Sequence, residues 1–161
     1  MRVESHPDGV VTEAGPRVTY DVERDEAHYG AAHVAGHAIV WEVDEALDGD
    51  WLVRCDRVEF PPGGVAYLHT HPGPGIRVLL KGRIRIETRG ESHEYGPFES
   101  WYETGADPVY AVASDDEDTA FVRVMLVPRE LEGRRTIRYV NPEDEDKPKL
   151  QRSRIYLEQQ L

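Results

Sequence analysis

Short runs of alternating apolar and polar residues, separated by proline and glycine, make up most of this chain. In Arg83–Glu87 the isoleucines fall on one face and the charged residues on the other, which is the period of a half-buried strand. Because 14 Gly and 11 Pro fall between such runs, the pattern favours strands and turns over long helices. We predict strands at Arg17–Val22, Ala38–Val43, Trp51–Phe60, Ala66–His71, Ile76–Leu80, Arg83–Thr88, Ser92–Tyr95, Trp101–Glu103, Val109–Ala113 and Ala120–Val127.

Strands at this spacing predict an all-β antiparallel sandwich or barrel. Outside them, His28–Gly36 is small and broken by glycine, so we expect an ordered arm there. Asn141–Pro148 has the composition of an acidic linker, and Arg152–Leu157 fits either a last strand or a short helix.

Length and charge narrow the class of protein. A chain of 161 residues suits a single domain with a core of its own. With 31 acidic and 19 basic residues the net charge is -12, which disfavours nucleic acids and anionic membranes as partners. The single cysteine, Cys55, cannot form an internal disulfide, and Met1–Val11 lacks the pattern of a secretory signal. We therefore expect a cytoplasmic protein.

Candidate chemistry begins at His69 and His71. On a strand, residues two apart share a face and lie about 7 Å apart along the chain, so both imidazoles can converge on one metal ion. By itself such a pair is a weak signal, because short His-x-His strings arise by chance.

The residues around the pair are more specific. Five residues separate Gly63 from His69, three separate His71 from Gly75, and six separate Gly75 from Gly82. This spacing resembles the first motif of the cupin superfamily, in the form found in small bacterial single-barrel proteins.

The resemblance continues downstream with less detail. Phe98–Val109 fits the second cupin motif in length, with Thr104–Ala106 at the family's Pro-x-Gly position. Ala120–Pro128 looks like the last barrel strand, so the resemblance covers Val53–Pro128.

The resemblance implies a cupin-type jelly-roll β-barrel in a single domain, 1–161. Its barrel-like core would be 51–128, preceded by an N-terminal arm with the first strands at 1–50 and followed by a C-terminal extension at 129–161. Small proteins of this kind are commonly homodimers whose arms and edge strands pair with the partner barrel, and such pairing would cover the exposed strand edges.

The sequence departs from the family at its metal site. The family takes two histidines and a glutamate from the first motif and one histidine from the second. Here Gly75 stands at the glutamate position and Val109 at that of the last histidine. His69 and His71 need a further ligand to hold a divalent metal such as Fe, Mn, Ni or Zn, and Glu103 is the best replacement.

Two residues suggest a ligand pocket instead of, or beside, a metal. Gly75 should point into the barrel, so by alternation Arg77 points inward and needs an anionic partner, either Glu103 or a carboxylate on a ligand. Tyr67 should share the face of His69 as a weak ligand or an acid. If Arg77 pairs with Glu103, the metal loses its third ligand, and both arrangements stay open.

Other reactive side chains have simpler interpretations. We expect Cys55 to be a buried strand residue and not a nucleophile. The acidic runs Asp115–Asp118 and Glu143–Asp146 lack the spacing of calcium loops, so we expect solvated turns. We expect His28, His33 and His37 to lie together in a loop by accident and not to form a second metal site.

Two functions follow from these residues. The first is a metal-dependent enzyme acting on a small organic acid or phenol through His69 and His71. The second is a non-catalytic module that binds or senses a small carboxylate through Arg77 without a metal. Whether a third protein ligand exists beside the two histidines distinguishes them.

Overall fold

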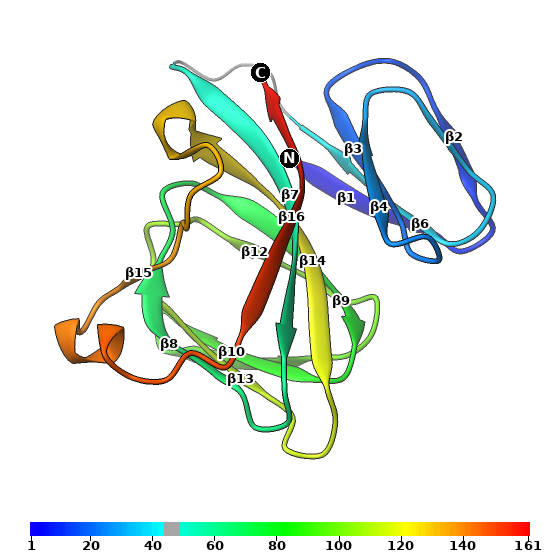
Figure 1. Ribbon diagram of the computed structural model, residues 1–161. Helices are drawn as coiled ribbons and strands as arrows, with labels where there is room; N and C mark the ends of the chain where they lie inside the picture. Colours follow the sequence, from blue (N-terminus) through cyan, green and yellow to red (C-terminus); the bar gives the residue numbers. More distant parts are fainter. Residues whose placement is uncertain (44–48) are drawn as a thin grey trace.

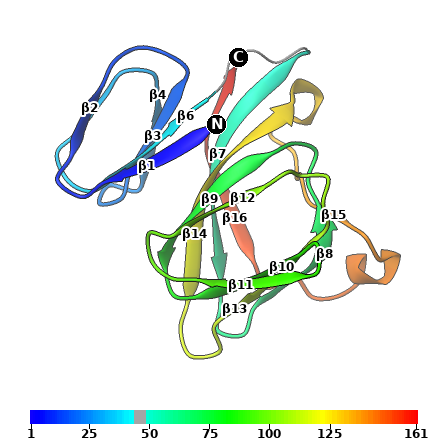
Figure 2. The ribbon, with the colours of Figure 1, turned by 180° about the vertical axis from the view of Figure 1, so that it is seen from behind.

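Antiparallel strands form almost all of the computed structural model, which describes residues 1–43 and 49–161. Two five-stranded sheets face each other across a barrel (Figures 1 and 2). The first sheet has the order β12 (Ser100–Glu103), β9 (Gly75–Lys81), β14 (Thr119–Pro128), β7 (Trp51–Phe60), β16 (Arg152–Gln160). The second has the order β11 (Glu91–Tyr95), β10 (Ile84–Thr88), β13 (Val109–Ala113), β8 (Val65–Thr70), β15 (Arg138–Tyr139). The all-β jelly-roll barrel predicted from the sequence is confirmed.

The N-terminal region forms a third layer. Its sheet has the order β1 (Arg2–His6), β6 (Ala38–Glu42), β3 (Arg17–Asp21), β4 (Glu26–Tyr29), and β2 (Val10–Thr12) pairs with β5 (Ala32–Val34). In Figure 1 this blue lobe lies beside β7 and β14. Its apolar residues, among them Tyr20 and Trp41, share one core with the outer face of the barrel sheet.

This third layer explains the long apolar runs of the central strands. Val122 and Val124 of β14 point outward against the N-terminal sheet, whereas Phe121 of the same strand points into the barrel core. A strand covered on both faces reads as nearly continuous hydrophobic sequence. Any charged residue inside such a run is therefore forced into one of the two cores.

The C-terminal extension is part of the barrel. β16 pairs with β7 along nearly its whole length, and β15 pairs with β8. The short 3-10 helix η1 (Arg129–Leu131) precedes β15, and η2 (Pro142–Glu145), drawn in orange in Figure 1, lies between β15 and β16. Asp144 in η2 is buried and pairs with Lys147 at 2.5 Å, so the expectation of a solvated acidic turn is wrong at this residue. The predicted core at 51–128 thus lacks two strands of the barrel.

The strand predictions hold with small shifts at the ends. Trp51–Phe60 and Val109–Ala113 match β7 and β13 in both bounds, and Arg152–Leu157 lies within a strand and not a helix. The expected arm at His28–Gly36 instead contributes to β4 and β5, and the sequence pattern missed β1, β2 and β15. Residues 44–48 of the predicted arm lie outside the described residues.

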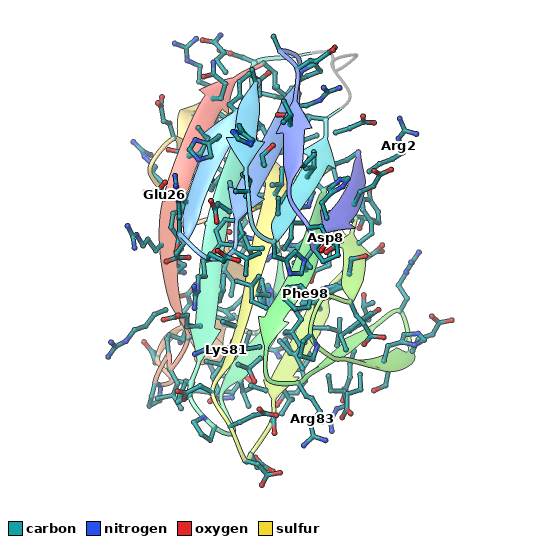
Figure 3. All side chains as sticks on the ribbon, turned by 90° about the vertical axis from the view of Figure 1, so that its right-hand side faces the viewer. Arg2, Asp8, Glu26, Lys81, Arg83 and Phe98 are labelled. Carbon is teal, nitrogen blue, oxygen red and sulfur yellow. The ribbon has the colours of Figure 1, made fainter. Side chains whose placement is uncertain are left out.

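Charged side chains also cover the surface of the molecule. Figure 3 views the molecule from the side of the N-terminal sheet, and charged side chains such as Arg2 and Arg83 project from it. Within the described ranges, no helix has the length and apolar character needed to cross a membrane. The arm and β16 find strand partners within their own chain, and the homodimer stays a prediction.

Candidate functional site: an ionic pocket inside the barrel

Period-two alternation places charged side chains inside the barrel. On β9, Ile76 and Val78 face the N-terminal sheet, so Arg77 between them faces inward and is fully buried. On β14 the same parity turns Arg123 inward between Val122 and Val124. The inward position of Arg77 agrees with its expected alternation from Gly75.

Each arginine has its own carboxylate. Arg123 donates from Nε and Nη2 to the two oxygens of Asp56 on β7, at 2.7 and 2.8 Å, in a bidentate pair. Arg77 Nη2 lies 2.7 Å from Glu103 Oε2 on β12, and Glu103 Oε1 accepts a hydrogen bond from Trp101 Nε1 at 2.9 Å. Of the two anionic partners considered for Arg77, Glu103 or a ligand carboxylate, the structure pairs Arg77 with Glu103.

The two arginines differ in how well they are satisfied. Arg77 Nη1 donates to the carbonyl of Gly75 at 2.8 Å, but its Nε and Nη2 atoms are buried and make no aligned hydrogen bond to any residue in 1–43 or 49–161. Among the described residues, Glu103 Oε2 likewise makes no aligned hydrogen bond. The close contact between Arg77 and Glu103 is therefore an ion pair and not a bidentate hydrogen-bonded pair. Burial lowers the pKa of Arg77 to about 10, only partly offset by Glu103. Burial also opposes the charge of Arg123, yet Asp56 raises the pKa of that group.

His71 is held at both ring nitrogens. Arg123 Nη1 lies 3.3 Å from His71 Nε2, which must accept because a guanidinium can only donate. The proton is then on Nδ1, which lies 3.4 Å from the hydroxyl of Thr136 in the extension. Burial, followed by the charges of Arg123 and Arg77, holds the pKa of His71 well below its usual range. The ring is thus a neutral structural link between barrel and extension.

His69 has a fixed tautomer. Its Nδ1 lies 2.6 Å from the carbonyl oxygen of Tyr67, so Nδ1 carries the proton and Nε2 keeps its lone pair. Burial lowers its pKa, although nearby Glu103 opposes the shift. His69 lines the pocket as a neutral acceptor, with its ring centroid 4.9 Å from that of His71.

Tyr67 is a correction to the predicted site. β8 is irregular opposite β13: Val109 pairs with His69 but Ala111 pairs with Ala66, so three steps on β8 oppose two on β13. Both Ala66 and His69 line the pocket, whereas the Tyr67 ring lies under Lys147 Nζ at 4.7 Å. The bulge breaks the alternation on which the expectation for Tyr67 rested.

The predicted metal set does not fit a metal ion in this arrangement. Glu103 is engaged by Arg77, and the His71 Nε2 lone pair faces a guanidinium. Among residues 1–43 and 49–161, no three His, Cys, Asp or Glu side chains are grouped as a metal requires. Two guanidinium groups at this position would repel a cation.

A cavity of about 100 Å³ lies between these ionic residues and an apolar wall. Phe60, Trp101 and Phe121 supply its aromatic surface, and Val109 stands opposite His69 where the family has a histidine. The extension closes the cavity with residues that include Thr136 and Gln151. The cavity therefore has an apolar, largely aromatic part and a polar part lined by the paired charges.

Sequence reasoning missed Asp56, Arg123, Thr136 and Gln151. A signal for the first two exists, since each is an isolated charge in an otherwise apolar strand core. No sequence signal marks Thr136 and Gln151, because only the path of the extension brings them to the barrel.

The other candidates have structural positions. Cys55 is buried in the core under the N-terminal sheet, and burial raises the pKa of its thiol. His28 lies on β4 and His33 on β5, and His37 Nε2 lies 2.7 Å from Ser5 Oγ.

The fold and the buried site define a small jelly-roll barrel with an ionic interior. Residues 56–125 match the family described as Cupin domain, so this part of the barrel is similar to that family. No curated protein sequence matches it.

Several solved structures share the barrel. A protein of unknown function from Rhizobium leguminosarum bv. viciae 3841 is 23% identical over 48% of this chain and 71% of its own (TM-score 0.42). The DMSP lyase DddQ from Ruegeria pomeroyi DSS-3 is 20% identical over 56% of this chain and 44% of its own (TM-score 0.49). A cupin protein from Bacteroides fragilis is 18% identical over 59% and 90% (TM-score 0.43). The chain thus spans less than half of the lyase, and these similarities concern the fold alone.

Proposed function

We propose that this cupin barrel binds a small organic acid, with the carboxylate on Arg77 and without a metal ion. The observation that carries the proposal is the unsatisfied Nε–Nη2 edge of Arg77, a fully buried guanidinium at the wall of the cavity. The same edge of Arg123 is filled by Asp56. Among the described residues, the Nε–Nη2 edge of Arg123 is therefore filled by a bidentate carboxylate, whereas that of Arg77 has only the ion-pair contact of Nη2 with Glu103 and can accept a ligand oxygen at Nε.

A carboxylate suits the free edge for energetic reasons. Leaving a buried donor without a partner costs about 1–3 kcal/mol, and more for a charged group. A carboxylate oxygen on each of Nε and Nη2 removes that cost in the planar geometry that arginine prefers. Because Nη2 carries two N–H groups, it can donate one to the ligand and keep its ion pair with Glu103, whose Oε1 keeps its hydrogen bond from Trp101.

The rest of the cavity selects an apolar body. Phe60, Trp101 and Phe121 offer aromatic surface to a ring or a short aliphatic chain. At about 100 Å³ the cavity is smaller than the closed cavity of about 150 Å³ that holds one benzene, so the part of the ligand inside the barrel is at most one ring in size. Benzoate is the simplest probe with these properties.

Calorimetry with benzoate and its neutral analogue benzyl alcohol tests the proposal. We expect benzoate to bind, Arg77→Met to weaken it by about tenfold or more, and Glu103→Gln to strengthen it by removing the competing carboxylate. The exposed Arg85→Met is the matched control and should change nothing. Equal binding of benzoate and benzyl alcohol, or unchanged benzoate affinity in Arg77→Met, would overturn the carboxylate assignment.

The competing function is a metal-dependent enzyme that uses His69 and His71. One observation favours it: the Nδ1–H of His69 contacts a backbone carbonyl, the arrangement usual for metal-binding histidines. Metal analysis of protein purified without a histidine tag, before and after exposure to Fe, Mn, Ni or Zn, separates the two. Stoichiometric metal that is lost in Glu103→Gln would establish a metal site that includes Glu103 and overturn the metal-free proposal, whereas tighter benzoate binding in that variant supports ours.

A further inference from the structure

Gln151 brings a second polar group to the cavity from the C-terminal extension. It immediately precedes β16, whose first residue, Arg152, pairs with Glu59 on β7. Its side chain lines the same cavity as Arg77. The position of Gln151 is therefore set by strand pairing and not by a free loop.

The side-chain amide of Gln151 is only half satisfied. Nε2 donates to the hydroxyl of Tyr139 at 3.3 Å, whereas Oε1 is buried and accepts no hydrogen bond among the described residues. Tyr139 belongs to β15 and pairs with His69 on β8, so the amide is held between two strands of the barrel. A buried acceptor without a donor is a cost in the empty protein that a ligand can relieve.

We propose that Gln151 is a specificity-determining residue that selects organic acids carrying a hydrogen-bond donor, a hydroxyl or an amino group, away from the carboxylate. The inference rests on the proposed function, because it concerns the ligand that Arg77 holds. The carboxylate satisfies the Arg77 donors, and the hydroxyl or amino group satisfies Gln151 Oε1. A ligand without the donor leaves that oxygen buried and unpaired, which is how polar sites discriminate between similar ligands.

The ligand class is then a hydroxy or amino derivative of a one-ring or short-chain acid. Arg77 on β9 and Gln151 beside β16 are separated in one sheet by β14 and β7, and Phe121 and Phe60 of these two strands also line the cavity. An apolar body between two polar ends matches this distribution of side chains.

The test compares benzoate with its ortho, meta and para hydroxy and methoxy derivatives by calorimetry. The methoxy group accepts hydrogen bonds but cannot donate one. We expect at least one hydroxybenzoate to bind about tenfold more tightly than benzoate and than its methoxy counterpart, the scale of one well-placed hydrogen bond. In Gln151→Met this preference should vanish, so that the hydroxybenzoate, its methoxy counterpart and benzoate bind within about twofold of one another.

Gln159→Met is the matched control, because Gln159 is an exposed glutamine of the same extension. It should keep the full preference for the hydroxy acid. Thermal unfolding of both variants shows whether the fold is intact.

Each remaining outcome overturns the inference in a distinguishable way. If benzoate binds but no hydroxybenzoate binds better, Gln151 selects no donor and the inference alone fails. The same holds if the preference survives in Gln151→Met, because another acceptor such as His69 Nε2 then receives the hydroxyl. If a methoxybenzoate is preferred, Gln151 presents its N–H and the donor class is wrong. If no carboxylate binds the wild type, the proposed function fails and this inference with it.

Discussion

Arg77 and Arg123 stand directly opposite each other on the neighbouring strands β9 and β14, both inside the barrel. Like charges at such positions destabilise a sheet unless each is compensated. Asp56 and Glu103 flank them in the same sheet and supply that compensation. The barrel interior therefore contains two neighbouring ion pairs, Arg123–Asp56 and Arg77–Glu103, and not a single isolated charge.

The Arg123–Asp56 pair should show strong coupling. Arg123→Met leaves the Asp56 carboxylate buried without a partner, and we expect a loss of about 3–5 kcal/mol in the free energy of unfolding. The double variant Arg123→Met/Asp56→Leu should lose less than Arg123→Met alone, because no orphan charge remains. Urea denaturation of the two single variants and the double variant measures the coupling. Additive losses would show that the two groups do not act as a pair.

Restoring the family's glutamate at Gly75 should not create a metal site. A Cβ atom at Gly75 would lie 2.6 Å from Met125 Cβ and 2.6 Å from the Val124 carbonyl oxygen. Gly75→Ala should therefore cost about 1–3 kcal/mol through overpacking, and Gly75→Glu should cost at least as much without raising metal uptake. Chemical denaturation and metal analysis check both points.

Gly96→Ala serves as the control for this prediction, because an added Cβ there meets its nearest atom, Glu99 Oε2, at an ordinary 3.5 Å. A stable Gly75→Glu variant that binds metal stoichiometrically would contradict the prediction.

Acid should weaken the contact between the N-terminal sheet and the barrel through Asp25. Although burial disfavours its charge, hydrogen bonds from Tyr20, Tyr156 and Arg57 lower the pKa of Asp25 below the usual 3.8. The unfolded chain thus takes up this proton first, so the stabilisation is complete above about pH 4 and is lost as the pH falls through the lowered pKa.

Asp25→Asn removes this titration. We expect its free energy of unfolding to fall less steeply than that of the wild type between about pH 5 and pH 3. Asp8→Asn, at an exposed turn, should keep the wild-type slope. Identical slopes for Asp25→Asn and the wild type would rule out the contribution of Asp25.

Arg54 should hold the extension on the barrel. It is buried and donates to the carbonyl oxygens of Leu131 at 2.9 Å and Arg134 at 2.8 Å, and its Nε donates to Glu158 at 2.7 Å. Arg54→Met should cost about 3–5 kcal/mol and expose the segment around Arg134 to trypsin. The exposed Arg152→Met is the control. Unchanged cleavage at this segment in Arg54→Met would show that other contacts hold the extension.

Local pattern determined much of the fold. Alternation along β7, β9, β13 and β14 predicts the strands and turns Arg77 inward, because the side-chain period of a strand is a property of the backbone alone. The spacing around His69 and His71 resembles the first cupin motif, and this resemblance implies the barrel.

Tertiary structure decided what the pattern left open or misplaced. The bulge on β8 separates Tyr67 from the pocket. Whether Glu103 pairs with Arg77 or binds a metal depends on side chains from different strands. The extension places Thr136 and Gln151 against the barrel only after β15 and β16 have paired.

The division has one physical reason. The sequence by itself determined which residues are strands and which face each side chain takes, because these follow from neighbours along the chain. Only the tertiary structure decided which carboxylate meets Arg77 and which residues close the pocket. Those contacts join residues far apart in sequence, and each depends on the competing charges and volumes of its spatial neighbours.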